Sequence, residues 1–180
     1  MLLKFKTSHL VTVLFTATVV LSSTTAFANK AQCKQDYEKI ISKEITKMGT
    51  AFNDSNYQYI ADKSDSSIIE LTGGKANYDA ILLQAVTAFK NENIKVNKVD
   101  TQPPKESHII HNKEFCVIPK HTSISINGKN VTGDMSFMLA VRPLDSNEWK
   151  YIDGAGLKKN PDMLQILFPE IPPNKIILPK

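Results

Sequence analysis

The sequence predicts an α+β domain preceded by an export signal. Apolar residues recur every three or four positions in residues 32–48 and again in residues 78–91, which is the period of an amphipathic helix. From residue 94 the period changes to two, in short segments separated by turn residues, as is typical of antiparallel strands. Helices followed by a run of strands favour helices packed on one antiparallel sheet over an alternating α/β fold.

The first 28 residues have the three parts of a secretory signal peptide. Lys4 and Lys6 make the start basic, an apolar run covers residues 10–21, and the segment ends in Ala26-Phe27-Ala28. The apolar run is shorter than the roughly 20 residues that cross a membrane as a helix. We therefore expect cleavage after Ala28, a protein in the periplasm or secreted, and no membrane attachment afterwards; an uncleaved anchor is the alternative.

The predicted mature chain is one domain with an appended tail. Removal of residues 1–28 from the 180 leaves 152, enough for a single hydrophobic core. We expect an α+β domain over residues 29–157, then a short helix and an extended proline-rich tail over residues 158–180. The net charge falls from +4 to +2 when Lys4 and Lys6 leave. The remaining lysines are interleaved with acids, which argues against nucleic acid as a partner.

Cys33 and Cys116 are the two cysteines of the chain. In an oxidising compartment an even number of cysteines favours pairing, so we predict a disulfide between them. Two buried free thiols are the alternative. Neither cysteine has a histidine beside it in sequence, so a catalytic thiol is not expected.

Four helices are predicted. The first covers residues 32–48 and ends at Gly49, and the second covers residues 52–61 with Asp54 or Ser55 as its cap. The third, residues 78–91, carries an apolar stripe of Ile81, Leu82, Ala85, Val86 and Phe89. The fourth starts at Asn160-Pro161-Asp162, and the prolines from residue 169 onward prevent its continuation.

The predicted strands follow the period-two segments. Pro119 is expected at an edge or bulge, Asn127-Gly128 at a hairpin turn, and Gly154 and Gly156 after the last strand. The strands are expected at residues 67–72, 94–99, 107–118, 122–126, 132–141 and 148–153.

This order of elements resembles the NTF2-like (cystatin-like) superfamily. The resemblance covers about residues 32–157 and depends on three segments: residues 68–74, the helix at residues 78–89, and a late strand with Trp149, Tyr151 and Gly154. It implies a curved sheet that wraps a long helix into a cone with a pocket inside. NTF2-like domains often pair through the open sheet face, so the resemblance also allows a homodimer.

Some proteins of this architecture, similar to ketosteroid isomerase, use a pocket acid and hydroxyl donors in proton-transfer chemistry. The residues that could correspond are Asp62, Asp134, Tyr57 and Tyr59, although no motif matches position by position. Phe137, Trp149 and Tyr151 recur on predicted strands and are interpreted either as core residues or as the lining of a ligand cavity.

No metal site and no cofactor are predicted. His108, His111 and Glu114 lie three residues apart, but on a strand His111 would point to the opposite face from the other two, and His121 follows only after Pro119. The serines occur in neither G-x-S-x-G nor S-x-x-K, the motifs of familiar acyl-transfer enzymes.

These observations favour an exported, non-catalytic binding protein. One version is an inhibitor or immunity-type protein that binds a protein partner in the exported compartment, and another is a carrier of a small apolar ligand. The alternative is a cofactor-independent isomerase or dehydratase with Asp62 or Asp134 as base. A cavity plugged by apolar side chains would favour a surface binder, whereas an open cavity with an acid near a tyrosine would favour the enzyme.

Overall fold

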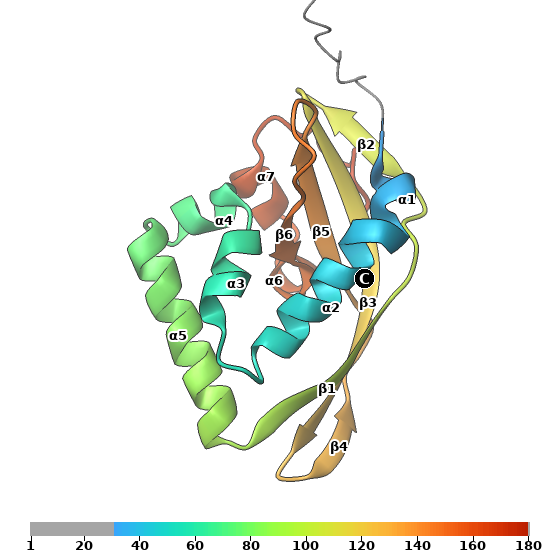
Figure 1. Ribbon diagram of the computed structural model, residues 1–180. Coiled ribbons are helices and arrows are strands. Elements are labelled where there is room, and N and C mark those ends of the chain that lie inside the picture. Colours follow the sequence, from blue (N-terminus) through green and yellow to red (C-terminus); the bar gives the residue numbers. More distant parts are fainter. Residues whose placement is uncertain (1–30, 180) are drawn as a thin grey trace, which may run out of the picture.

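The computed structural model describes residues 31–179, so the predicted signal peptide and its cleavage site lie outside the described residues. An N-terminal helical segment comes first, and a long helix, α5, leads into the sheet (Figure 1). The helices are α1 Cys33–Asp36, the π-helical turn η1 Tyr37–Ile41, α2 Ser42–Ala51, α3 Tyr57–Lys63, α4 Ser66–Leu71, α5 Lys75–Asn91, α6 Gly154–Lys159 and α7 Met163–Leu167.

A curved, open antiparallel sheet forms the centre of the molecule and confirms the predicted α+β class. Four strands follow one another in the order β1-β3-β5-β6, and β2 and β4 also pair with β3. The strands found in residues 31–179 are β1 Ile94–Thr101, β2 Ser107–Ile110, β3 Lys113–Ile126, β4 Lys129–Thr132, β5 Ser136–Pro143 and β6 Lys150–Asp153.

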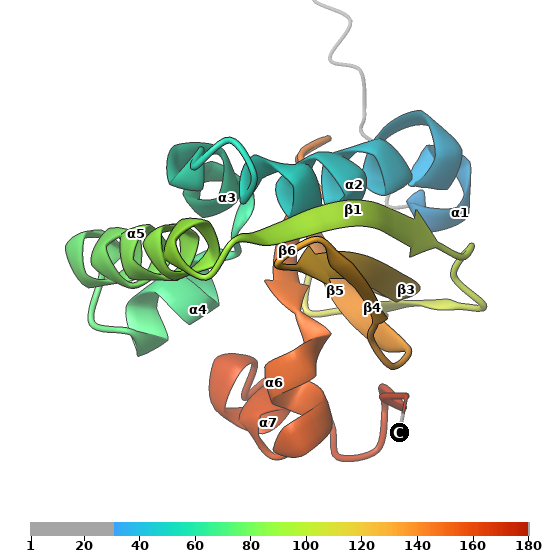
Figure 2. The same ribbon diagram turned by 90° about the horizontal axis from the view of Figure 1, so that it is seen from below.

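The sheet has a separate apolar cluster on each face. Figure 2 shows α1, α2 and α3 on one side of the strands and α6 and α7 on the other. Side chains alternate along β3, so that Cys116 and Ile118 pack with α2, whereas Phe115 packs with Leu164 and Phe168. Both faces of β3 are therefore covered, which explains its near-continuous burial from Glu114 to Ile118.

The start of α1 is attached to the sheet by covalent and polar contacts. Cys33 and Cys116 form the predicted disulfide, with a Cα–Cα distance of 6.4 Å. The backbone N–H groups of Gln32 and Cys33 donate to the Glu114 carboxylate at 2.9 to 3.0 Å. A carboxylate at a helix N-terminus satisfies N–H groups that have no partner within the helix. These contacts fix the N-terminal helical segment over β3.

The strand predicted at residues 67–72 is wrong, because this segment is helix α4. The Asp65 Oδ1 atom accepts hydrogen bonds from the Ser67 N–H at 2.9 Å and from the Ser67 hydroxyl at 2.7 Å. This is an N-cap, which favours helix over strand. A short apolar run fits both periods, so periodicity alone could not distinguish them.

Other predicted boundaries shift for local reasons. The second helix starts after Asn56, whose side chain accepts from the Tyr59 N–H, and neither Asp54 nor Ser55 caps it. Residues 107–118 are not one strand, because His111 and Asn112 take positive φ and form a turn between β2 and β3. Residues 133–135 interrupt the strand predicted at 132–141, and the last strand ends before Gly154, as expected, where α6 begins.

Pro119 lies inside the central strand β3 and not at the predicted edge or bulge, but it sits where the neighbouring strands leave a gap. On one side of β3, β2 pairs as far as Cys116 and β1 begins at Lys120. The Pro119 carbonyl accepts from the Gln102 N–H at 2.9 Å on that side. The nitrogen and the carbonyl of one strand residue point to the same side, so the Pro119 nitrogen faces the gap between β2 and β1. No ladder hydrogen bond is lost there.

Gly49 does not end the first helical segment, which continues to Ala51. A Cβ atom on Gly49 would lie 2.4 Å from the Val99 Cγ2 atom. The glycine therefore allows α2 to approach β1 closely, which is a packing role rather than a capping one.

The C-terminal residues continue the cluster on the second face. Asn160 and Pro161 open a turn that leads into α7, close to the predicted start. Ile171 and Ile176 are buried beyond it, and only Ile177 of the tail's isoleucines is strongly exposed. Within residues 31–179, none of the helices has the length and apolar character needed to span a membrane.

Candidate ligand cavity

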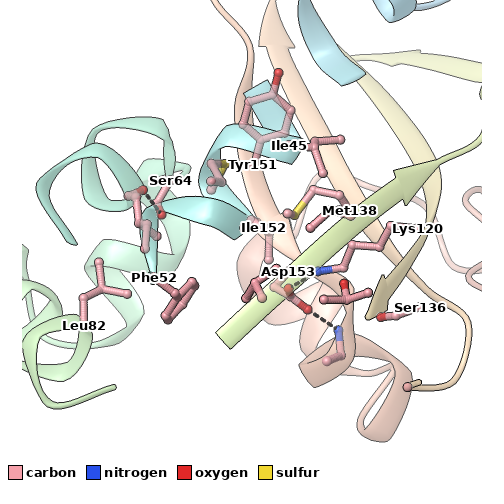
Figure 3. A pocket seen from close by; sticks show the side chains of 18 of the residues that line it. Ile45, Phe52, Ser64, Leu82, Lys120, Ser136, Met138, Tyr151, Ile152 and Asp153 are labelled. Atoms are coloured by element: carbon pink, nitrogen blue, oxygen red, sulfur yellow. Dashed lines mark hydrogen bonds and ion pairs between the residues drawn. The ribbon is translucent and has the colours of Figure 1, made fainter. Parts of the chain in front are cut away.

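A cavity of about 510 Å³ lies between the sheet and helices α2, α3 and α5 (Figure 3). It forms because α5 packs on α3 and on the start of β1 and leaves space over the middle of the sheet. Its volume falls in the range of small-molecule sites, about 300 to 1,000 Å³. The apolar side chains in its lining are Ile45, Met48, Phe52, Ile60, Ile68, Leu82, Phe89, Val96, Val99, Ile124, Met138, Ile152 and Ala155.

The end of the cavity nearest the helices is mostly apolar, with the Ser64 and Tyr78 hydroxyls as its polar groups. Phe52 and Leu82 lie on this side in Figure 3, with Ile45 and Met138 toward the sheet. The rings of Phe52 and Phe89 pack with their centroids 4.9 Å apart. Surfaces of this kind favour the aliphatic or aromatic part of a ligand, because burial removes apolar area from water.

The opposite end contains the three charged residues of the lining, Lys120, Asp134 and Asp153. Lys120 on β3 forms an ion pair and hydrogen bond with Asp153 at the end of β6. The Asp153 Oδ1 atom also accepts from the Ala155 N–H at 2.8 Å and so caps α6. Ser136, at the start of β5, is the register partner of Lys120. Asp134 lies in the exposed loop between β4 and β5.

A second polar pair, Ser64 and Tyr78, joins α3 to α5 on the helical side. The two hydroxyl oxygens are 2.7 Å apart, and the Ser64 hydroxyl donates to the Ile60 carbonyl at 2.8 Å. Burial raises the pKa of Tyr78, an effect that its hydrogen bond with Ser64 opposes. Both hydroxyls therefore stay neutral at ordinary pH and serve to connect the two helices.

Tyr151 contributes its ring to the lining but directs its hydroxyl elsewhere. The hydroxyl donates to Glu44 Oε2 at 2.7 Å, and Glu44 also pairs with Lys63. Burial raises the pKa of Tyr151, and the hydrogen bond and charge of Glu44 add to the shift. Glu44 does not line the cavity, so this acid–tyrosine pair supports the structure beside the site.

The four residues considered as catalytic candidates do not form a constellation. Asp62 and Tyr57 are on α3, and Asp62 is exposed. Tyr59 packs against the apolar cluster between the sheet and α2. The Lys47 Nζ atom lies over the Tyr59 ring, 4.3 Å from the ring centroid. Burial, and then the charge of Glu44, raises the pKa of Tyr59. Of the four, only Asp134 lines the cavity.

The aromatic residues on the strands divide between cavity and core. Tyr151 lines the cavity, whereas Phe137 and Trp149 are core residues. Phe137 packs on the second face, where a Cβ atom on Gly154 would lie 2.5 Å from its ring. Trp149 donates from Nε1 to the Asp36 Oδ2 atom at 3.0 Å and thereby holds α1.

The histidines and Glu114 are not gathered around a common point. His108 lies on β2 near Glu106, His111 is in the turn, and His121 lies opposite Asp100 of β1 in the strand register. The Glu114 carboxylate accepts hydrogen bonds from the N–H of Cys33 in α1 and from Arg142 Nη2. Across the part of the chain that the structure describes, no three such side chains form a group that could hold a metal ion.

Sequence reasoning missed Lys120, Ser136 and Asp153. Lys120 and Ser136 are not near each other in sequence and belong to no motif. The alternation of side chains along β3 and β5 could have located them. Lys120 is two residues from Ile118 and Ser136 is two residues from Met138, so both point to the face of the sheet that α2 covers. A correct register between the two strands would have placed them side by side.

Comparisons with known proteins give no relative on which to base a function. No protein-family model, curated protein or solved structure matches the chain. A function is therefore inferred from the cavity itself.

Proposed function

We propose that this chain is an exported, non-catalytic protein that binds a small, largely apolar molecule in the cavity between its sheet and helices. The observation that carries the proposal is an apolar-lined space of about 510 Å³ that the protein's own side chains leave open. An NTF2-like cone would provide this kind of site. The disulfide supports export, because such bonds persist in oxidising compartments.

The open cavity favours the carrier version of the prediction over the inhibitor version. An inhibitor acts through its surface and does not need an internal cavity, whereas a carrier requires one. Proton-transfer chemistry would need a carboxylate free to act as base. Asp134 lines the cavity but is exposed to water in its loop, and both oxygens of the Asp153 carboxylate already accept hydrogen bonds from Lys120 and from the Ala155 N–H, which favours a binding role.

The experiment is a fluorescence titration of residues 29–180 with the apolar probe N-phenyl-1-naphthylamine. Thr122 lies on β3 and lines the cavity, so Thr122→Phe should fill part of the space. We expect the unmodified protein to bind the probe with enhanced emission and the variant to bind it at least about tenfold more weakly, which corresponds to about 1.4 kcal/mol.

The matched control is Ser123→Phe. Ser123 is the next residue of the same strand, so its side chain points to the opposite face, and it does not line the cavity. This variant should bind like the unmodified protein. Equal binding by both variants, or no binding by the unmodified protein, would refute the proposal.

A further inference from the structure

Building on the proposed function, we infer that the ligand is an amphiphile whose head group accepts hydrogen bonds, with Lys120 and Ser136 as the donors. The apolar tail then occupies the space under α3 and α5. The inference names the chemical class of the ligand and its orientation in the cavity, and it depends on three features at the polar end.

The first feature is the ammonium group of Lys120, whose side chain is largely shielded from water by the protein. The Lys120 side chain is 12 % exposed, against 53 % for its partner Asp153. An ammonium carries three N–H donors, and Asp153 is the sole acceptor for Lys120 Nζ that residues 31–179 provide. A ligand that displaces water from the cavity would leave the remaining donors without acceptors unless it supplied one itself.

The second feature is the hydroxyl of Ser136. Its Oγ atom is buried, lines the cavity region and has no hydrogen-bond partner in the described part of the chain. Most buried polar atoms in proteins have a partner, and an exception calls for an explanation. A ligand oxygen at this end of the cavity provides that explanation.

The third feature is the register that brings the two donors together. Lys120 and Ser136 are directly opposite each other on β3 and β5, which places their Cβ atoms roughly 4.5–5.5 Å apart. Figure 3 shows both side chains, with Asp153, at the end of the cavity away from Phe52 and Leu82. A single oxygen-bearing head group can therefore contact both donors while its tail extends toward the helices.

The acids at this end do not create the opposite preference. Asp153 uses Oδ1 to cap α6 and Oδ2 to pair with Lys120, so each of its oxygens already accepts a hydrogen bond from the protein. Asp134 is exposed to water in its loop. The groups at this end that lack a full set of partners include two donors, the Lys120 ammonium and the Ser136 hydroxyl, and an acceptor head group satisfies both.

The test is displacement of N-phenyl-1-naphthylamine by three ligands with comparable tails: decanoic acid, methyl nonyl ketone and decylamine. The acid and the ketone offer acceptor oxygens, whereas the ammonium of decylamine offers only donors. We expect each acceptor ligand to bind at least about tenfold more tightly than the amine. Ser136→Ala and Lys120→Met should each reduce that preference several-fold, while Lys120→Arg keeps a donor and retains most of it.

Lys150→Met is the matched control. Lys150 also lies on a strand and pairs with an acid, Glu148, but it does not line the cavity, so its loss should leave the preference unchanged. Equal affinity for all three ligands, with the probe still bound, would overturn the head-group assignment and leave the proposed function standing. Failure of the probe itself to bind the unmodified protein would overturn both the head-group assignment and the proposed function.

Discussion

Glu114 and Arg142 lie directly opposite each other on β3 and β5 and form a fully buried ion pair, with 2.6 Å between Arg142 Nη2 and Glu114 Oε2. The carboxylate also accepts from the N–H groups at the start of α1. The guanidinium donates to the Ser146 carbonyl at 2.8 Å and lies over the Trp149 ring. One pair of side chains thus connects the N-terminal helical segment, two strands and the loop before β6.

Removing one partner of this pair should be strongly destabilising. Glu114→Ala removes the buried carboxylate that pairs with the Arg142 guanidinium and the acceptor at α1, so we expect a loss of about 3–5 kcal/mol in the free energy of unfolding. Urea denaturation measures it. Glu148→Ala, an exposed acid, is the control and should change stability by less than about 0.5 kcal/mol. A small effect of Glu114→Ala would show that α1 is held mainly by other contacts.

The disulfide should contribute a comparable amount. Cys33 and Cys116 are 83 residues apart, and a loop of this length is worth about 4.5 kcal/mol in the loop-entropy model. The Cys33→Ala, Cys116→Ala double variant should unfold at lower urea concentration than the unmodified protein. A reducing agent should lower the midpoint of the unmodified protein but not that of the variant, and equal midpoints without reductant would contradict this account.

Gly49 and Val99 should be energetically coupled. Gly49→Ala places a methyl group against Val99 Cγ2, and such overpacking costs about 1–3 kcal/mol. Val99→Ala removes the opposing methyl groups, so the double variant should be more stable than the sum of the single effects by about 1 kcal/mol. Additive effects in a double-mutant cycle would mean that α2 can shift on β1 without cost.

Tyr151 should make the protein less stable in alkali. Burial and Glu44 raise the pKa of Tyr151 in the folded state above its ordinary value of 10.0. The stability that neutral Tyr151 contributes is therefore fully present below pH 10. It is lost as the pH rises further, because the Tyr151 hydroxyl ionises more readily in the unfolded chain than in the folded protein. Tyr151→Phe should reduce the fall in unfolding free energy above pH 10 by up to about 1.4 kcal/mol per pH unit. Identical slopes for the two proteins would contradict the raised pKa.

The sequence predicted the elements with strong periodicity and failed where a single cap decides the conformation. The helix that contains Leu82 and Val86 and the hairpin at Asn127-Gly128 both appear where expected. The segment at Ile68 and Ile69 was assigned as strand, because its short apolar run suits either period and the Asp65 cap outside it decides for helix.

The site was much less predictable than the fold. The cavity depends on how far α5 stands from the sheet, which no local pattern encodes. Trp149 and Phe137 have the same aromatic character as Tyr151, yet only the ring of Tyr151 reaches the cavity. Lys120 and Ser136 lie side by side only because of the register between β3 and β5, which the sequence of either strand does not specify.

The most direct test of ligand binding in the cavity is an NMR titration of protein labelled at the isoleucine δ1 methyl groups, with methyl nonyl ketone as ligand. Ile45, Ile60 and Ile124 line the cavity, whereas Ile109 and Ile177 are exposed and lie outside its lining. The account predicts saturable shifts for the first three methyl groups and none for the other two. Shifts at Ile109 and Ile177 with the cavity methyl groups unchanged, or no shifts at all, would contradict it.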